Sequence, residues 1–507
     1  MVRILSSRST WCEQPVTAVG LLVDGDDYYR AFYRAAEAAT REILLSGWQF
    51  DSDACLLRGP EAEHAELPVT LLAYLDALCR RRPELRIYML AWDFHAVFAV
   101  EREWMQAQRF NWATSDRLQF MFDASHVEGA SHHQKFAVID GELGFLGGMD
   151  LCDHRWDNRG HNDPNPLRVS RGAEHRPFHD VQAYLVGREA ASSLVDLFAS
   201  RWVAAGGEPI VRSDVPTAPA AAPPWRADYA PHGAVPIASD RVAFSRTDPH
   251  GSPNGATDCR EVWALYAAAI DGAERLIYME SQYLSSRDIS TALIERMTAA
   301  QRSKLDIVIV LNTQAESVKE EVAIGLAQAK IIRELRSTAA DTGHRLGIFY
   351  TVPATQGGTE PKRPTYIHSK ITVVDDRFLT VGSANLTNRS MGIDTEINVS
   401  FETDDADDAL GRSIRAARHS LIAEHRGVDD TQSYDRRGLA KSLLEAAERK
   451  EGRLRIHPSP TAKESAVIDV IDPQLLPFDP GANEGHDQDR SIFAQGLGVL
   501  WQRLSSR

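Results

Sequence analysis

The sequence is poor in cysteine and has no long apolar run, and each absence excludes a class of protein. Five cysteines are scattered over 507 residues without a CxxC pair, so neither a disulfide framework nor a cysteine zinc site is expected. No stretch of about 18 apolar residues occurs, which argues against a transmembrane helix. The first residues, MVRILSSRSTWCEQP, lack the apolar core of a secretory signal.

Positive charge is also in deficit, since the formal net charge is −15. An acidic protein repels a polyanion at long range, so we expect no general nucleic-acid partner. A local basic pocket inside the acidic envelope is still compatible with this charge. With 43% hydrophobic and 25% charged residues, the chain has the composition of an ordinary globular protein, long enough for two or three domains.

One short pattern, HxKxxxxD, occurs twice. Its two copies are His133, Lys135 and Asp140, and His368, Lys370 and Asp375. Both copies are followed by a glycine turn, Gly147-Gly148 in the first and Gly382-Ser383 in the second. The offset between the copies is constant, because 368 − 133 and 375 − 140 both equal 235. This regularity predicts the internal duplication of a whole folding unit.

A segment rich in proline and alanine separates the two copies. It runs from Ser213 to Pro236 with the sequence SDVPTAPAAAPPWRADYAPHGAVP, a composition typical of a linker. We therefore predict a first lobe at 1–212, a linker at 213–236, a second lobe at 237–430 and a C-terminal extension at 431–507.

Strand and helix patterns alternate along both halves. Apolar runs rich in β-branched residues predict strands at 85–90, 136–139, 305–311 and 371–374. Helices are expected at 68–79, 190–204, 317–339 and 409–425, with Gly427 ending the last. The alternation predicts an α/β fold of two similar lobes, each a mixed sheet flanked by helices, related by a pseudo-twofold axis.

The repeated pattern also predicts chemistry. Residues two apart on a strand share a face, so each histidine is expected beside its lysine. If the lobes pack about a pseudo-twofold axis, two imidazoles and two ammonium groups converge on one volume, which favours an anion. A phosphodiester fits, because one histidine can attack phosphorus while the other protonates the leaving oxygen.

Further candidates flank the two patterns. The glycine turns let backbone amides approach a phosphate, which makes Gly148 and Ser383 candidate phosphate-binding residues. Asn385 would add a side-chain donor, whereas the first half has Asp150 at that position. Asp140 and Asp375 close the patterns, either as members of the catalytic set or as partners of the following turn.

These motifs resemble the phospholipase D superfamily, whose signature is two HxKxxxxDxxxxxxG(G/S) motifs in one bilobal chain. The resemblance covers roughly residues 16–428 and is to phospholipase D enzymes proper, through SHHQK, GGMDLCDHRWD, PFHDV, ESQYLSS, IHSK, GSANLTNRSMGIDTEIN and IAEHRG. It implies a phosphohistidine intermediate, with His133 as nucleophile and His368 as general acid and base; the reverse assignment is open.

The same resemblance implies the supporting roles. Lys135, Lys370 and Asn385 would bind phosphate. Asp180 and Glu396, 47 and 28 residues after the histidines of their own halves (180 − 133 and 396 − 368), would orient the histidines from neighbouring strands. No metal or other cofactor is implied. Five further histidines fit no standard metal spacing and are expected at the rim of the site or on the surface: His132, His154, His161, His175 and His179.

The leading hypothesis is a phospholipase D that hydrolyses glycerophospholipids at a membrane surface. A cardiolipin synthase-type phosphatidyltransferase and a catalytically silent lipid-binding scaffold are the alternatives, and a nuclease is disfavoured by the acidic charge. We expect a monomer that is an internal pseudo-dimer, with a cytoplasmic or peripheral membrane location; export without an N-terminal signal stays open.

Overall fold

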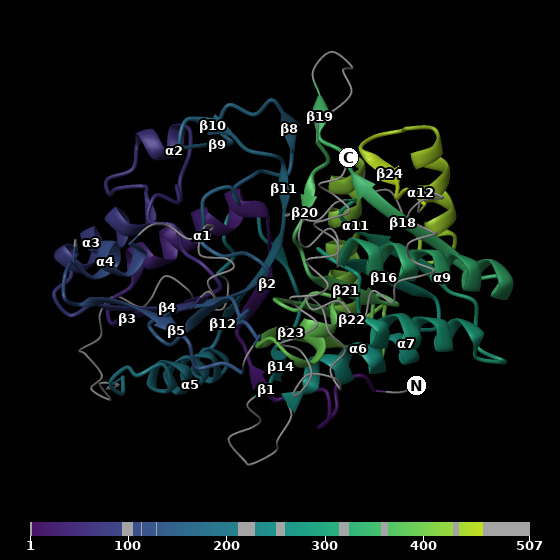
Figure 1. Cartoon of the computed structure of the whole chain (residues 1–507), viewed down its shortest axis with the longest axis horizontal. Coiled ribbons are helices and arrows are strands. Elements are labelled where there is room, and N and C mark those ends of the chain that lie inside the picture. The colour runs from purple at the N-terminus through teal and green to yellow at the C-terminus, as the bar shows by residue number, and fades with distance from the viewer. Residues whose placement is uncertain are drawn as a thin grey trace, which may run out of the picture.

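The chain forms two α/β lobes that lie side by side, as the computed structural model shows (Figure 1). The structure describes residues 3–93, 105–112, 114–127, 129–210, 229–249, 259–313, 324–355, 363–428 and 435–459. Each lobe has a mixed sheet with helices on both faces, so the predicted fold class is confirmed.

The first lobe is built on an eight-stranded sheet in the order β13-β2-β12-β7-β6-β3-β4-β5. In that order the strands are Val235–Pro236, Ala18–Val23, Val181–Val186, Leu143–Gly147, Phe136–Ile139, Glu42–Gly47, Arg86–Trp92 and Leu118–Asp123. Strands β3, β4 and β5 are mutually parallel, and the other neighbours are antiparallel.

The second lobe is built on a ten-stranded sheet in the order β1-β14-β23-β22-β21-β16-β17-β18-β24, with β15 beside β14. In that order the strands are Cys12–Pro15, Arg241–Asp248, Glu396–Glu402, Phe378–Gly382, Ile371–Val374, Leu276–Glu280, Asp306–Val310, Arg345–Thr351, Leu454–Ile456 and, for β15, Cys259–Arg260. From β14 to β18 this sheet repeats the order and strand directions of the first sheet from β2 to β5. The repeat agrees with a duplicated unit, while the pseudo-twofold axis stays a prediction.

Helices cover both faces of each sheet. Those of the first lobe are α1 (Asp24–Ala38), α2 (Pro60–Glu63), α3 (Leu71–Arg81), α4 (Gln106–Trp112) and α5 (Arg188–Ala204). Those of the second are α6 (Glu261–Gly272), α7 (Arg287–Thr298), α9 (Leu326–Thr342), α10 (Asn388–Gly392), α11 (Ala409–Arg426) and α12 (Leu439–Glu448). The helices predicted at 68–79, 190–204 and 409–425 are thereby confirmed as α3, α5 and α11.

Local chemistry explains the bounds of α11. The Asp408 side chain accepts a hydrogen bond from the Gly411 amide (2.7 Å) and so caps the first turn. Gly427 ends the helix at a φ of 67°, a conformation that glycine adopts without strain. The start of the helix predicted at 317–339 lies outside the described residues, and its remainder is part of α9.

The lobes share an apolar cluster, besides a further cluster in each lobe, and are joined by short strand pairs. A single apolar cluster contains Leu146 and Val181 of the first sheet together with Val381 and Val399 of the second. Two parallel pairs cross between the lobes, β11 (Phe178–His179) with β20 (Tyr366–Ile367) and β8 (Asn162–Asp163) with β19 (Ala354–Thr355). A small hairpin, β9 (Val169–Ser170) with β10 (Ala173–Glu174), completes the strands.

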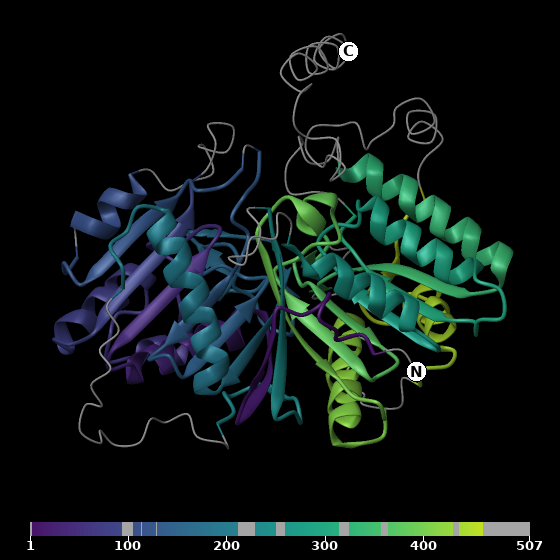
Figure 2. The same ribbon diagram turned by 90° about the horizontal axis from the view of Figure 1, so that it is seen from below.

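The predicted domain boundaries need correction at both ends. Strand β1 pairs with β14 of the second sheet, although it falls in the segment assigned to the first lobe (Figure 2). Strand β24, in the segment assigned to the extension, pairs with β18. Both add hydrogen-bond partners at an edge of the second sheet, and strands of three or four residues carry too little periodicity to reveal this from sequence. Residues 213–228 of the predicted linker lie outside the described residues, and β13 at its end pairs with β2.

Among the described residues, no helix combines the length and the apolar character needed to cross a bilayer.

Candidate active site

The two histidine-lysine pairs lie at matching places in the two sheets. Both occupy extended segments just before β6 and β21, not the strands themselves. The carbonyl oxygen of Lys135 accepts a hydrogen bond from Gly147 N (3.3 Å), and that of Lys370 accepts one from Gly382 N (3.1 Å). Each pair is therefore fixed to the end of the neighbouring strand that carries the glycine turn.

Each histidine is hydrogen-bonded to a carboxylate of the other lobe. His133 Nδ1 lies 3.0 Å from both carboxylate oxygens of Glu396, and His368 Nδ1 lies 2.6 Å from Asp180 Oδ2. Both carboxylates are fully buried. The sequence implied that each acid would lie beside the histidine of its own half; in the structure each contacts the histidine of the other half instead.

Backbone hydrogen bonds between the lobes explain the exchange. His133 N donates to Thr395 O (3.0 Å), and Thr395 directly precedes Glu396. In the same way, His368 N donates to His179 O (2.8 Å), and His179 directly precedes Asp180. Each carboxylate is thus held beside its histidine by a peptide contact one residue earlier, so the two lobes must be docked for either pair to form.

The two lysines have different neighbours. Lys135 Nζ lies 3.4 Å from Asp150 Oδ2 and donates to His133 O. Lys370 Nζ donates to His368 O and to Gln282 Oε1, the latter at 3.2 Å. The charge of Lys135 is therefore balanced by a carboxylate, whereas the two hydrogen bonds of Lys370 described above go to oxygens of neutral groups.

Gln282 is a site residue that the sequence did not single out. Its Oε1 accepts hydrogen bonds from Lys370 and, at 3.4 Å, from Asn385 Nδ2. It therefore fixes two of the candidate phosphate-binding groups relative to each other. The available signal was its position two residues after β16, the strand next to β21 in the sheet.

Asp150 departs from the role its position suggests. Its Oδ1 accepts a hydrogen bond from Trp48 N (2.8 Å), and its Oδ2 faces Lys135. A carboxylate placed this way accepts hydrogen bonds and repels a phosphate oxygen, so only Asn385 of the equivalent pair is a candidate donor.

Gly148 and Ser383, predicted to bind phosphate, instead support the carboxylates. Ser383 Oγ donates to Glu396 Oε2, so its proton is engaged there. Gly148 N faces Val181 O at 3.5 Å, and a Cβ at this position would collide with Asp180 Oδ1 and lie 2.9 Å from His368 O. The two residues are equivalent in the duplicated unit, and each sits against the acid that holds a histidine.

Replacing Gly148 by alanine is therefore expected to impair the site without unfolding the protein. The added methyl group pushes Asp180 away from His368, and a misplacement of this kind lowers kcat about 10- to 100-fold. Steady-state kinetics of Gly148→Ala with a short-chain phospholipid measures the effect. An unchanged kcat would show that the Asp180–His368 contact is not needed. Gly272→Ala, at the end of α6 where an added Cβ would make only ordinary contact with Ile4, controls for general effects of the substitution.

Asp140 and Asp375, predicted as members of the catalytic set, are instead hydrogen-bonded to backbone amides. The Asp140 carboxylate accepts hydrogen bonds from the amides of Thr40, Arg41 and Glu42 (2.7–3.0 Å). That of Asp375 accepts hydrogen bonds from the amides of the equivalent segment, Glu274, Arg275 and Leu276 (2.7–2.8 Å). Both tie the turn after the motif to the start of the adjacent strand, which corrects the catalytic assignment to a structural one.

The variant Asp375→Ala is expected to lose stability but keep its chemistry. It leaves three backbone donors without their acceptor, which lowers the free energy of unfolding by about 3 kcal/mol. Thermal unfolding followed by circular dichroism should show a lower Tm, while kcat well below that Tm changes less than about threefold. A large loss of kcat with an unchanged Tm would restore Asp375 to the catalytic set.

Burial and positive charge favour the neutral form of both histidines. Burial lowers the pKa of His133 well below its usual value, and the charges of Lys135 and Lys370 add to the shift. Burial, followed by the charges of Lys370 and Arg155, lowers the pKa of His368 in the same way. Burial also lowers the pKa of Lys370 to about 7, against the opposing effect of Asp180. Charges of both lobes thus act on each imidazole, as expected of one shared site.

The five other histidines do not form the exposed rim that the sequence suggested. His132, His161, His175 and His179 are buried, and only His154 is exposed. His132 lies between Asp123 and Thr395 on the first-lobe side of the site. His161 and His179 are held among carboxylates from both lobes. Sequence spacing could not show this, because these carboxylates come from distant parts of the chain.

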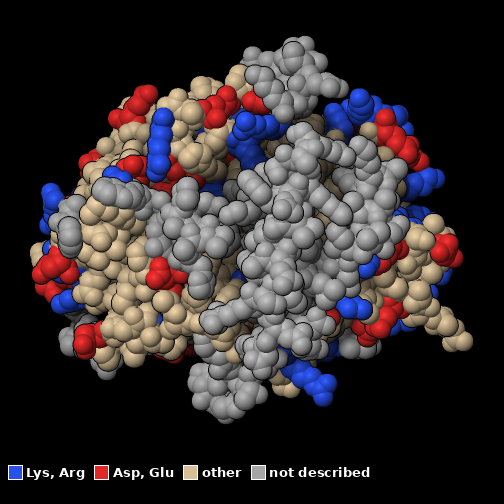
Figure 3. Space-filling model, viewed as in Figure 1, with Lys and Arg blue, Asp and Glu red and all other residues tan. Residues whose placement is uncertain are grey.

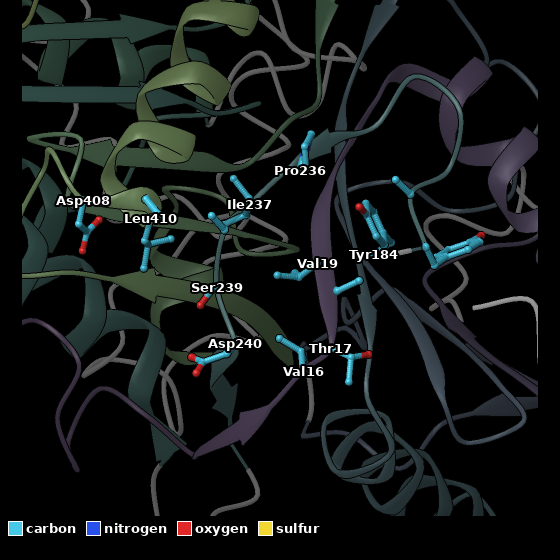
Figure 4. A pocket seen from close by; sticks show the side chains of 15 residues that line it. Val16, Thr17, Val19, Tyr184, Pro236, Ile237, Ser239, Asp240, Asp408 and Leu410 are labelled. Carbon is cyan, nitrogen blue, oxygen red and sulfur yellow. The ribbon is translucent and has the colours of Figure 1, made fainter. Parts of the chain in front are cut away.

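A cavity between the lobes does not coincide with this site. It has a volume of about 740 Å³. Val19 and Tyr184 line it on one side and Asp408 and Leu410 on the other (Figure 4). Its charged side chains, Asp240 and Asp408, disfavour a phosphate.

On the face of the described residues seen in Figure 3, Lys and Arg are interspersed with Asp and Glu, whereas Lys135 and Lys370 are buried at the paired histidines.

Comparison with known proteins finds similarity to the same family as the motifs do. A family model described as "Cardiolipin synthase, PLD-like domain" matches residues 266–415. Phospholipase D A of Dictyostelium discoideum is 25% identical over 445 residues, which cover 78% of this chain and 33% of that protein. Phospholipase D alpha 3 of Arabidopsis thaliana is 25% identical over 484 residues, covering 73% and 58%. The chain thus spans less than two thirds of these relatives.

The fold also has a counterpart among solved structures. The phosphatidylserine synthase of Haemophilus influenzae Rd KW20 superposes with a TM-score of 0.50 at 14% identity, over 90% of this chain and 97% of that one. At this identity the superposition concerns the fold alone. The duplicated HxKxxxxD segments and the matches in sequence lead to one conclusion: the chain belongs to the phospholipase D superfamily.

Proposed function

We propose that this protein is a phospholipase D, which hydrolyses the distal phosphodiester bond of glycerophospholipids to phosphatidate and a free alcohol head group. The observation that carries the proposal is the exchanged pairing of two buried histidines with two buried carboxylates, beside two buried lysines. Such a site supplies a nucleophile, an acid and a cationic cradle for a single phosphodiester.

In the first step, His133 Nε2 attacks phosphorus while Nδ1–H stays hydrogen-bonded to Glu396. The bond from phosphorus to the head-group oxygen breaks, and His368 gives a proton to that oxygen. The anionic substrate favours the protonated form of His368 and so opposes the effect of burial, which lowers the pKa of this histidine. The ammonium groups of Lys135 and Lys370 and the amide of Asn385 stabilise the nonbridging oxygens.

In the second step, His368 accepts a proton from water, the water oxygen attacks phosphorus, and the bond to His133 Nε2 breaks. Phosphatidate leaves and both imidazoles return to their starting state. A lipid alcohol in place of water would give a phosphatidyltransferase, and the family model over residues 266–415 favours this as the second candidate. A catalytically silent scaffold has no need for two complete His-Lys pairs.

The partner we propose is a phospholipid at a membrane surface. Because both halves of the site lie in one chain, a monomer contains a complete site. These proposals predict activity on vesicles that does not depend on self-association of the enzyme.

Product analysis tests the function. The purified protein is incubated with vesicles of mixed phospholipids, with and without ethanol, and the lipids are separated. Phosphatidate alone, and phosphatidylethanol when ethanol is present, support the phospholipase D. Cardiolipin formed from phosphatidylglycerol supports the transferase instead, and an absence of turnover would support the scaffold.

The pH dependence of activity is expected to reflect Lys370. Its ammonium form binds the phosphate, and its pKa of about 7 in the free enzyme means that the charge is lost as the pH rises through 7. We therefore expect kcat/KM to fall above pH 7 by up to tenfold per pH unit. Lys370→Arg keeps its charge at these pH values, so its lower activity should lack this alkaline decline. A decline of equal position in both enzymes would assign it to another group.

A further inference from the structure

Four side chains converge at a buried point between the lobes, outside the catalytic set. They are Asp24 at the start of α1, His161, His179 of β11 and Glu424 of α11. Glu424 Oε1 lies 2.7 Å from His179 Nδ1 and 3.0 Å from His161 Nε2. The two oxygens of Asp24 lie 3.1 and 3.3 Å from the same nitrogens. All four residues are buried.

These separations suit the edges of a small tetrahedron. With zinc-to-ligand bonds of about 2.0 Å, tetrahedral ligand atoms lie roughly 3.3 Å apart. The measured nitrogen-to-oxygen distances, 2.7–3.3 Å, are at or slightly below that value. A small relaxation would therefore admit an ion at the centre.

The outer nitrogens of both histidines are bound as in known metal sites. His161 Nδ1 lies 2.9 Å from Asp157 Oδ2, and His179 Nε2 lies 2.9 Å from Glu280 Oε2. A carboxylate on the far nitrogen fixes the tautomer and leaves the near nitrogen as a ligand. Here both near nitrogens face the same two carboxylates.

Asp24 provides an independent sign that the cluster is incomplete. Its Oδ2 is buried and has no hydrogen-bond partner, although it faces His161 Nε2. A carboxylate oxygen that accepts no hydrogen bond in the interior is costly. Glu424 Oε1, by contrast, faces both imidazoles, while Arg159 binds Oε2 (2.6 Å). One divalent ion would bind Asp24, Glu424 and both imidazoles at once. Its charge of +2 balances the two carboxylates, which would otherwise require a proton on each imidazole.

We propose that Asp24, His161, His179 and Glu424 bind one zinc ion in a closed site. With four protein ligands the ion has no open position, so it is structural and takes no part in the phosphoryl transfer. This departs from the sequence expectation, since the family resemblance implied no metal and the spacing of the five further histidines fitted no standard metal site.

The ion would tie the lobes together beside the catalytic pair. Three ligands belong to the first lobe, and Glu424 belongs to the second. His179 also accepts the hydrogen bond from His368 N, and the next residue, Asp180, holds the His368 imidazole. Removal of zinc should therefore loosen the contact between the lobes at that histidine.

Metal analysis of the full chain tests the site without reference to its activity. The protein is produced in zinc-supplemented medium, dialysed against metal-free buffer and analysed by mass spectrometry for metals. We expect about one zinc per chain, a lower Tm after removal with a chelator, and recovery of the Tm with Zn²⁺ but not with Mg²⁺. Replacement by Co²⁺ should give the visible spectrum of a tetrahedral site.

Two variants locate the ion. Glu424→Gln preserves the size of the side chain and should lower the zinc content at least tenfold. His175→Gln changes a buried histidine outside the cluster and should keep about one zinc per chain. A wild-type protein without stoichiometric zinc and with a Tm insensitive to Zn²⁺ overturns the proposal, as does undiminished zinc in Glu424→Gln.

Discussion

Replacing either motif histidine by alanine is expected to reduce turnover at least ~10⁴-fold, the largest effect predicted for this protein. His133→Ala removes the proposed nucleophile, so no covalent phosphatidyl intermediate forms. His368→Ala removes the proton donor, so the intermediate forms slowly from natural head groups but forms readily from a substrate with an acidic leaving group. Pre-steady-state release of p-nitrophenol from a p-nitrophenyl phosphodiester separates the two variants: His368→Ala should release a burst of about one equivalent per enzyme, and His133→Ala none.

His175→Ala serves as the matched control, because His175 is buried but makes no contact with the paired histidines that the structure describes. Its activity should stay within a few-fold of the wild type. If the p-nitrophenyl substrate restores formation of the intermediate in His133→Ala and not in His368→Ala, the two roles are reversed. Full activity in either alanine variant would refute the shared site.

Neutralising the carboxylates is expected to have the second largest effect, a loss of about 10²- to 10⁴-fold in kcat. Glu396→Gln and Asp180→Asn preserve shape but no longer hold the correct tautomer of the imidazole. Since the pairs are exchanged between lobes, Glu396→Gln should impair the step that depends on His133 and Asp180→Asn the step that depends on His368. Pre-steady-state kinetics with quenched samples measures formation and decay of the intermediate separately.

A double-mutant cycle checks the exchange itself. Adding Glu396→Gln to His133→Ala should cost little more than His133→Ala alone, because the carboxylate acts through that histidine. Adding Asp180→Asn to the same variant is the control and should lower the residual activity further. Additive losses for His133 with Glu396, and coupling for His133 with Asp180, would mean that each acid serves its own half.

The sequence was a good guide wherever a feature depends on local pattern. The strands at 136–139 and 371–374 are found at the predicted residues, because a run of buried β-branched residues has few alternatives. Helix α11 ends at Gly427 for the reason predicted. The constant offset of 235 residues between the motifs anticipated two sheets with the same strand order.

Features that depend on how the lobes dock were not predictable in this way. The exchange of Glu396 and Asp180 follows from backbone contacts at Thr395 and His179, which carry no signature in the sequence. Asp140 and Asp375 belong to the motif, yet a motif does not tell a reacting group from one that secures a turn. Gln282 and Glu424 come near the active site and the buried cluster only through tertiary packing.

The shared site is tested most directly by a crystal structure of the protein with vanadate, which resembles a phosphoryl group in transfer. We expect one vanadate between the lobes, with His133 Nε2 and His368 Nε2 on opposite sides and both lysines at its equatorial oxygens. Two separate ions, each beside one histidine, or an ion that contacts one lobe alone, would contradict a shared site.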